Sequence, residues 1–118
     1  MLKEINEAEI YNVIKNKEFE KSIINSKKNV AVVMSQSWCW QWRMVNEWLP
    51  SISDIDDLDV YTIVYDNKKY YNDFLSFKEN VFGNYEVPYI RYYAGGKLIK
   101  ETNFISKESF LEIFNIKN

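Results

Sequence analysis

The sequence predicts an α/β fold: a central mixed sheet with a parallel β-α-β unit, an antiparallel C-terminal hairpin and flanking helices. Two apolar runs rich in β-branched residues, 30–34 and 60–65, predict central strands, because strands covered on both faces form continuous apolar stretches. The apolar residues between them recur at helical spacing, and a strand-helix-strand order implies a right-handed crossover between parallel strands. Gly95 and Gly96 separate the last two strand-like runs and favour a tight hairpin.

The individual elements follow from local patterns along the chain. Asn6 is the expected N-cap of a first helix, with Glu9 three positions later as in a capping box. A second helix after Asn16 completes a helical N-terminal segment, 1–28, and Pro50 is expected to kink or end a later helix. The elements expected in order are helices from residue 6 and after residue 16, strand 30–34, a helix after residue 39, strand 60–65, a helix within 68–81, strands 88–93 and 97–100, and a helix capped by Ser106.

Composition predicts one domain, 1–118, with its core in 29–118. The 118 residues are 47% hydrophobic and 17% aromatic, which is enough for a single core. The formal net charge of −2 comes from 15 basic and 17 acidic residues spread along the chain, so nucleic acid is not an expected partner. The longest apolar run is too short to span a bilayer and the first residues lack a secretory signal, so we expect a cytoplasmic protein with no membrane partner.

The sequence offers few side chains for nucleophilic catalysis or metal binding. The chain contains no histidine, which excludes histidine-based triads and imidazole metal ligands. The acidic stretch 54–59 lacks the glycine and the terminal glutamate of a calcium loop, so we expect a solvated connection there and neither a metal nor another cofactor. The single cysteine, Cys39, cannot close an internal disulfide, which fits a reducing compartment.

Cys39 is the candidate catalytic residue. It lies where an apolar strand meets a predicted helix, in the stretch Ser37-Trp38-Cys39-Trp40-Gln41-Trp42-Arg43. The N–H groups that open a helix have no internal partners and favour negative charge, so a thiol there ionises more easily than a free thiol. Arg43 either favours the thiolate further or is simply solvated. The alternative for Cys39 is a buried, inert cysteine that behaves as a small hydrophobic residue.

The chain resembles the thioredoxin family at three motifs: Ser37-Trp38-Cys39, the stretch 82–88 that ends in Val87-Pro88, and Tyr93-Ala94-Gly95-Gly96-Lys97. The resemblance runs from about residue 29 to the C-terminus and implies a thioredoxin-like fold. It also implies that Cys39 matches the family's attacking cysteine. Pro88 then matches the cis-proline that lies beside the sulfur and helps hold an extended peptide.

The sequence departs from the family at several positions. Trp42 stands where the family has its resolving cysteine, so that the C-x-x-C pair becomes Cys-Trp-Gln-Trp. Val33 stands where thioredoxins keep a buried acid, and Thr62 where they often keep a lysine. A helix-bearing insertion lengthens the connection between residues 66 and 88, and the N-terminal segment offers no clear counterpart to the family's first strand. The remaining cysteine can form a mixed disulfide but needs an external thiol to resolve it.

The residues expected around the sulfur have different roles. Trp42 falls near the apolar face of its helix, where it either fills core space that a thiol left or has a functional role. Trp40 points outward, and is either an anchor for a partner or packed against the 68–81 insertion. The expected substrate-binding residues are Trp38, Trp40, Val87 and Pro88.

Three hypotheses of function follow. The first is thiol–disulfide exchange in cell redox homeostasis: a monothiol disulfide oxidoreductase whose Cys39 forms mixed disulfides with a disulfide-bearing protein or a low-molecular-weight thiol. The second is a non-catalytic binding module that uses the surface around Trp40 and Pro88 to hold a protein partner. In the third, an exposed Cys39 joins two copies of the chain as a disulfide-linked homodimer.

Overall fold

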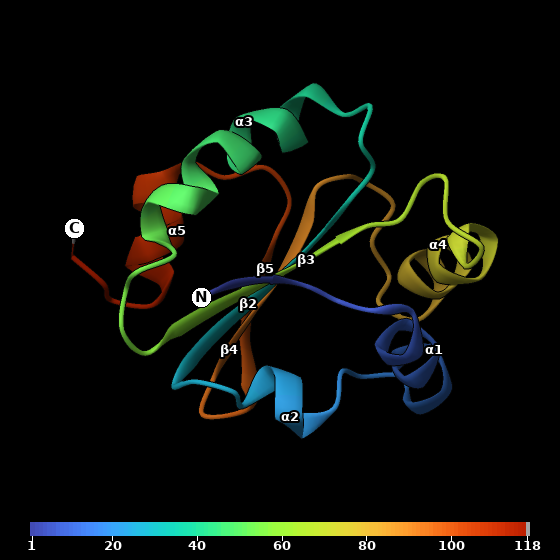
Figure 1. Cartoon of the computed structure of the whole chain (residues 1–118), viewed down its shortest axis with the longest axis horizontal. Coiled ribbons are helices and arrows are strands. Elements are labelled where there is room, and N and C mark those ends of the chain that lie inside the picture. Colours follow the sequence, from blue (N-terminus) through green and yellow to red (C-terminus); the bar gives the residue numbers. More distant parts are fainter. Residues whose placement is uncertain (118) are drawn as a thin grey trace.

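A five-stranded mixed sheet with helices on both faces forms the protein, in a computed structural model that describes residues 1–117 (Figure 1). The strands are β1 (Leu2–Glu4), β2 (Asn29–Ser35), β3 (Leu58–Val64), β4 (Tyr89–Ala94) and β5 (Lys97–Thr102). The helices are α1 (Glu7–Asn16), α2 (Lys21–Ile24), α3 (Trp40–Trp48), the 3-10 helix η1 (Leu49–Ile52), α4 (Tyr71–Asn80) and α5 (Lys107–Ile113). The predicted fold class is confirmed.

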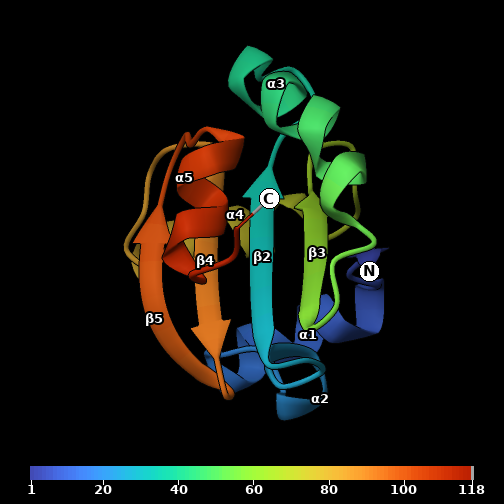
Figure 2. The same cartoon turned by 90° about the vertical axis from the view of Figure 1, so that its left-hand side faces the viewer.

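The strand order is β1-β3-β2-β4-β5. The strands β1, β3 and β2 are parallel to one another, whereas β4 runs antiparallel to β2 and to β5. The β2-α3-β3 segment is therefore the parallel β-α-β unit, and β4 and β5 form the antiparallel hairpin. Figure 2 views the sheet from the side on which α3 and α5 lie, with α4 on the far side.

The central strand β2 divides the interior into two cores. All seven of its residues are buried, as its continuous apolar sequence predicts. Val32 and Met34 pack on the face covered by α1, α2 and α4, while Ala31 and Val33 pack on the face covered by α3 and α5. Each face of the sheet thus has its own hydrophobic cluster, because successive side chains of a strand point in opposite directions.

The N-terminal segment corrects one expectation. The sequence predicts only helices in 1–28 and no first strand, yet β1 pairs in parallel with β3, with Leu2 opposite Val60 and Glu4 opposite Thr62. A strand of three residues is too short to produce a recognisable alternation, and its pairing depends on residues almost sixty positions away. The partner strand, and not the local pattern, determines this edge of the sheet.

The predicted capping box at the start of α1 is present. The Asn6 side chain accepts a hydrogen bond from the Glu9 N–H (2.8 Å), and the Glu9 carboxylate accepts one from the Asn6 N–H (2.9 Å). Later in the chain, the helix that follows β2 changes from α3 to η1 around Pro50, where a helix break or kink is expected. Local side-chain chemistry therefore sets both of these helix boundaries.

The hairpin between β4 and β5 uses the two predicted glycines. Gly95 and Gly96 adopt positive φ values of 59° and 78°, which residues with a Cβ reach only with strain. The register of the two strands shifts between Tyr92 and Tyr93. No helix within residues 1–117 is long and apolar enough to cross a membrane.

Candidate functional site

Cys39 lies at the N-cap of α3, directly after the connection from β2. Its backbone is extended, and its carbonyl accepts the first helical hydrogen bond, from the Arg43 N–H at 3.2 Å. The side chain makes no capping bond to the helix. As the N-cap residue, Cys39 directly precedes the N–H groups of the first turn, which have no partner inside the helix.

The segment before β4 covers the sulfur on one side. Cys39 Sγ lies 3.5 Å from the carbonyl oxygen of Val87, to which the thiol donates. The peptide bond between Val87 and Pro88 is cis. Cys39 is a free thiol and only 6% exposed, so access to the sulfur is narrow.

The loop before Cys39 is tied to the connection between β3 and α4. The Asp66 carboxylate accepts hydrogen bonds from the Ser37 N–H (2.7 Å) and from the Ser37 hydroxyl. Partial burial by itself would raise the pKa of Asp66, but the hydrogen bonds from Ser37 outweigh it and lower the pKa. The carboxylate is thus kept ionised and holds the loop in place.

Trp38 is fixed by its neighbours although its ring is 61% exposed. Its indole N–H donates to the Gln36 side chain (2.6 Å), which in turn donates to the hydroxyl of Tyr65 (3.3 Å). Burial raises the pKa of Tyr65 to about 12, so this hydroxyl is neutral over the physiological range. The Arg43 guanidinium donates to the Trp38 carbonyl (3.3 Å), so the observed contact of Arg43 is with the loop backbone.

The other two tryptophans of the stretch 37–43, Trp40 and Trp42, occupy opposite environments. Trp42 is 7% exposed and belongs to the same apolar cluster as Val33 and Cys39. Trp40 is 62% exposed. Its ring contacts Phe104, at a centroid distance of 6.4 Å, rather than the 68–81 insertion that the alternative expectation named.

Phe104 was not anticipated as part of this region. It lies in the connection between β5 and α5, and no periodic pattern in the surrounding sequence marks it. Large exposed apolar side chains occur on the loop before α3, on α3, on the segment that covers the sulfur and on the connection after β5, and we call them the apolar rim. The apolar rim consists of Trp38, Trp40, Met44, Tyr85 and Phe104.

A ring contact and a shared surface hollow link three members of the apolar rim. Trp40 packs on Phe104, and Met44 lines the same surface hollow as Phe104, between α3 and the start of α5. Tyr85, which is 71% exposed, precedes Val87 on the segment that covers the sulfur. Exposed aromatic side chains of this kind are favoured as anchors in protein contacts.

Metal chemistry has no support in the described part of the chain. Within residues 1–117, no three side chains of histidine, cysteine, aspartate or glutamate are grouped as metal ligands would be. The chemistry that the site can perform is that of a single sulfur at a helix start, with a carbonyl against it and apolar side chains around it.

No protein-family model and no curated protein matches the sequence. The structure, however, matches solved thioredoxins along nearly the whole chain. For thioredoxin O1 from Arabidopsis thaliana in its oxidised state, the TM-score is 0.68 at 15% identity, covering 96% of this chain and 94% of that chain. The fold is thioredoxin-like.

Thioredoxins from other organisms give the same result. A mutant thioredoxin from Halobacterium salinarum matches with a TM-score of 0.66 at 14% identity, over 95% of this chain and 85% of that chain. The thioredoxin of Malassezia sympodialis matches with a TM-score of 0.65 at 17% identity, over 97% and 89%. The resemblance that the sequence motifs indicate is confirmed for the fold. Identities this low say nothing by themselves about the reaction.

Proposed function

We propose that the protein exchanges disulfides through Cys39 alone, as a monothiol oxidoreductase. One observation carries the proposal: the only sulfur nucleophile lies at the N-cap of α3, 3.5 Å from the Val87 carbonyl and beside Pro88, in a thioredoxin-like fold. Unpartnered N–H groups at a helix start favour the thiolate, which is the nucleophile in disulfide exchange.

The proposed reaction needs one thiol from outside the chain. The Cys39 thiol loses its proton to solvent, and the thiolate attacks one sulfur of a partner disulfide. A mixed disulfide forms, and the other partner sulfur leaves as a thiolate. An external thiol then attacks the mixed disulfide, takes the partner sulfur and releases Cys39 as a thiolate. Trp42 cannot replace the external thiol because an indole has no sulfur.

The surroundings of Cys39 support a protein or peptide substrate. Trp38 and Trp40 present exposed rings on either side of the thiol in the sequence, and the carbonyl of Val87, which precedes Pro88, lies against it. The proposed partners are a disulfide-bearing protein and a low-molecular-weight thiol, rather than nucleic acid or a membrane. We place the reaction in the cytoplasm, since a lone unpaired cysteine suits a reducing compartment.

The rate of Cys39 alkylation as a function of pH tests this proposal. We expect the midpoint of the pH–rate profile to fall below ~8.5, the value for a free thiol, and a mixed disulfide to form with oxidised glutathione. Cys39→Ser is the control and should show neither reaction. A midpoint at or above the free-thiol value, with no mixed disulfide, contradicts the proposal.

A second candidate function is a binding module without catalysis. The observation that favours it is the apolar rim, because large apolar side chains exposed together mark contact surfaces. Trp42 and Val33 at the positions of the resolving thiol and the buried acid point the same way.

Two single variants separate the two functions. If the protein is a binding module, Trp40→Ala weakens capture of its protein partner and Cys39→Ser leaves capture unchanged. If it exchanges disulfides, Cys39→Ser abolishes the covalent complex. Loss of the interaction in Cys39→Ser together with full binding by Trp40→Ala rules out the binding module.

The disulfide-linked homodimer stays a prediction. Cys39 is 6% exposed, so two copies would have to displace the Val87 segment to join their sulfurs. Non-reducing electrophoresis at low protein concentration, with Cys39→Ser as the control, measures the linked fraction directly.

A further inference from the structure

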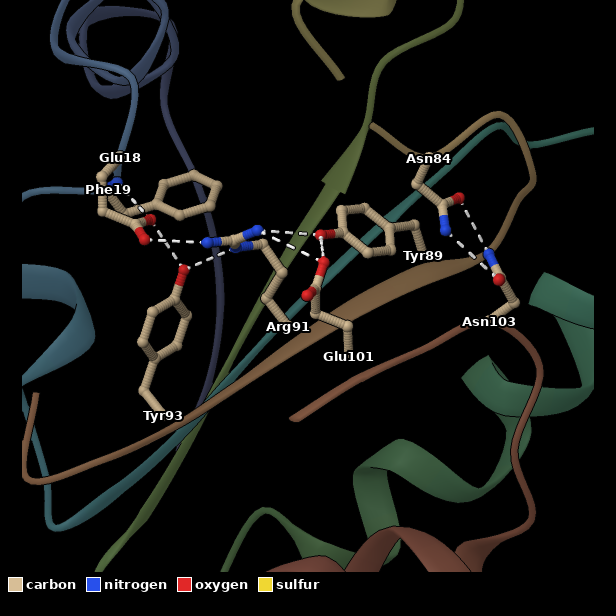
Figure 3. A network of polar contacts seen from close by, with 8 residues as sticks. All are labelled: Glu18, Phe19, Asn84, Tyr89, Arg91, Tyr93, Glu101 and Asn103. Atoms are coloured by element: carbon tan, nitrogen blue, oxygen red, sulfur yellow. Dashed lines mark hydrogen bonds and ion pairs between the residues drawn. The ribbon is translucent and has the colours of Figure 1, made fainter. Parts of the chain in front are cut away.

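The segment that covers the Cys39 sulfur is held by a pair of asparagines (Figure 3). The Asn103 amide nitrogen donates to the Asn84 side-chain oxygen at 2.9 Å, and the Asn84 amide nitrogen donates back to Asn103 at 3.2 Å. The Asn103 amide nitrogen also donates to the carbonyl oxygen of Pro88 at 3.0 Å. One side chain, from the connection after β5, thus contacts the covering segment at two points.

The Asn84 end of the segment is anchored to α4. Lys78, which is 1% exposed, donates from Nζ to the Asn84 carbonyl at 2.9 Å. The Asn84 side-chain oxygen also accepts the N–H of Glu86 at 3.0 Å. Asn84 therefore cannot shift without breaking contacts on both of its sides, and it gives Asn103 a fixed partner.

The start of the segment is anchored to β4. The Arg91 guanidinium lies over the Phe82 ring, 3.9 Å from its centre. Figure 3 shows how the hydroxyls of Tyr89 and Tyr93 and the carboxylate of Glu18 accept the guanidinium hydrogen bonds, at 2.8–2.9 Å. Because these contacts fix the start of the segment, the part that can still move lies between Asn84 and Pro88.

That remaining stretch carries the carbonyl that touches the thiol. Val87 precedes Pro88, whose carbonyl Asn103 holds, and the Val87 oxygen accepts the thiol hydrogen of Cys39. A carbonyl acceptor favours the protonated thiol, because a thiolate has no hydrogen to donate. The position of this carbonyl therefore affects both the access of reagents to the sulfur and its ionisation.

We propose that Asn103 is a positioning residue of the Cys39 site. Its carboxamide holds Asn84 and the Pro88 carbonyl so that the Val87 oxygen stays against the sulfur and keeps the thiol covered until a partner moves the segment. This proposal rests on the proposed disulfide exchange at Cys39. The contacts that define it are the hydrogen bonds described above.

Few charged groups accompany the thiol, so neutral substitutions give a clear test. Arg43 on α3 is bonded to the Trp38 carbonyl, Asp66 is bonded to Ser37, and Glu86 lies on the covering segment. Asn103→Ala adds no charge to this set, so a change in the pH–rate profile reports the position of the Val87 carbonyl.

The experiment compares the alkylation of Cys39 by iodoacetamide in the native protein, Asn103→Ala and Asn80→Ala. Asn80 is the matched control, because it is an exposed asparagine on α4 whose one side-chain bond is to Ser76. We expect Asn103→Ala to react about threefold to tenfold faster at pH 7, the ratio that the loss of one ordinary hydrogen bond gives, with a profile midpoint at lower pH. Asn80→Ala should match the native protein.

A native rate and midpoint in folded Asn103→Ala overturn the positioning role, and so does a slower rate. Should Asn103→Ala fail to fold, proton exchange of the Asn103 carboxamide in the native protein decides: both protons should exchange slowly, since the nitrogen donates twice, and fast exchange overturns the role. If native Cys39 is alkylated but never forms a mixed disulfide, the proposed function fails and the alkylation comparison still stands.

Discussion

The two faces of the sheet are stabilised in different ways. The face covered by α1, α2 and α4 contains a dense aromatic cluster together with buried charge, whereas the face covered by α3 and α5 is an apolar core that includes the thiol. The buried charged residues of the described chain all contact the first face or the turn after α2: Asp59 accepts from Ser26, Lys78 extends from α4, and Arg91 binds Glu18.

The difference shows where specific geometry comes from in this molecule. Buried polar groups must find partners, so the first face has one arrangement of Arg91 and its neighbours. On the second face, the arrangement of the side chains is determined by how their apolar volumes pack together. Its thiol receives its polar contact from the 82–88 segment, whose start is held by Arg91 and Lys78 of the first face. The scaffold of one face thereby determines the surroundings of the thiol on the other.

The largest expected effect tests the apolar face. Trp42→Ala removes an indole that is 7% exposed and should lower the free energy of unfolding by about 3–5 kcal/mol, because the cavity persists after partial relaxation. Urea denaturation measures the change. Trp40→Ala, at a position 62% exposed, is the matched control and should change stability by about 0.5 kcal/mol or less. Equal effects of the two variants would contradict the assigned burial.

The polar face is tested by Arg91→Met. The variant keeps most of the side-chain volume but leaves the hydroxyls of Tyr89 and Tyr93 without their donor, and we expect a loss of about 3 kcal/mol. Its control is Arg43→Met, which removes one exposed hydrogen bond and should cost about 0.5 kcal/mol or less. A loss for Arg91→Met below about 1 kcal/mol would mean that the network adds no specific stability.

The pH dependence of stability also separates the faces. Burial lowers the pKa of Lys78 to about 8 from the ordinary 10.5, so above pH 8 the unfolded chain binds a proton that the folded chain has released. Stability therefore rises with pH in this window. From pH 7.5 to 9.5, the native protein should gain about 1 to 2 kcal/mol relative to Lys78→Met, which has no ammonium to discharge.

Denaturation curves of both proteins at the two pH values give this difference. Other groups titrate equally in the two proteins and cancel. A constant difference between native protein and Lys78→Met would place the Lys78 ammonium in contact with water and contradict its burial.

The smallest expected effect compares two helix starts. Asn6→Ala removes the cap of α1 and should cost about 1 kcal/mol. Cys39→Ser places a good capping residue at the N-cap of α3, which has no side-chain cap, and should leave stability unchanged or raise it by about 0.5 kcal/mol. Chemical denaturation resolves both changes. A clear loss in Cys39→Ser would mean that the thiol is a structural residue.

Local patterns were sufficient for much of the fold. The strands β2 and β3, the capping box at Asn6 and the glycine hairpin were all predicted, because each depends on residues within a few positions of one another. The same holds for the strand-to-helix junction at Cys39. In contrast, β1 is determined by pairing with β3, and nothing in its three residues marks a strand.

The tertiary part of the site could not be predicted in this way. The burial of Arg91 requires Glu18, 73 positions away, and an arginine on a strand is ordinarily expected at the surface. The pairing of Asn84 with Asn103 and the contact of Phe104 with Trp40 likewise join loops that are distant in sequence. Loop residues follow no periodic hydrophobic pattern, so the sequence does not show which of them contact one another in the folded chain.

The burial of Trp42 limits which side chains this position can accept. Its indole is enclosed with Val33 and the side chains of α3 and α5, so Trp42→Cys would leave an empty volume in the core and weaken the whole domain. A stable cysteine at position 42 would require several neighbouring side chains to enlarge at the same time. Packing at position 42 thus disfavours a second thiol there, independently of the chemistry of Cys39.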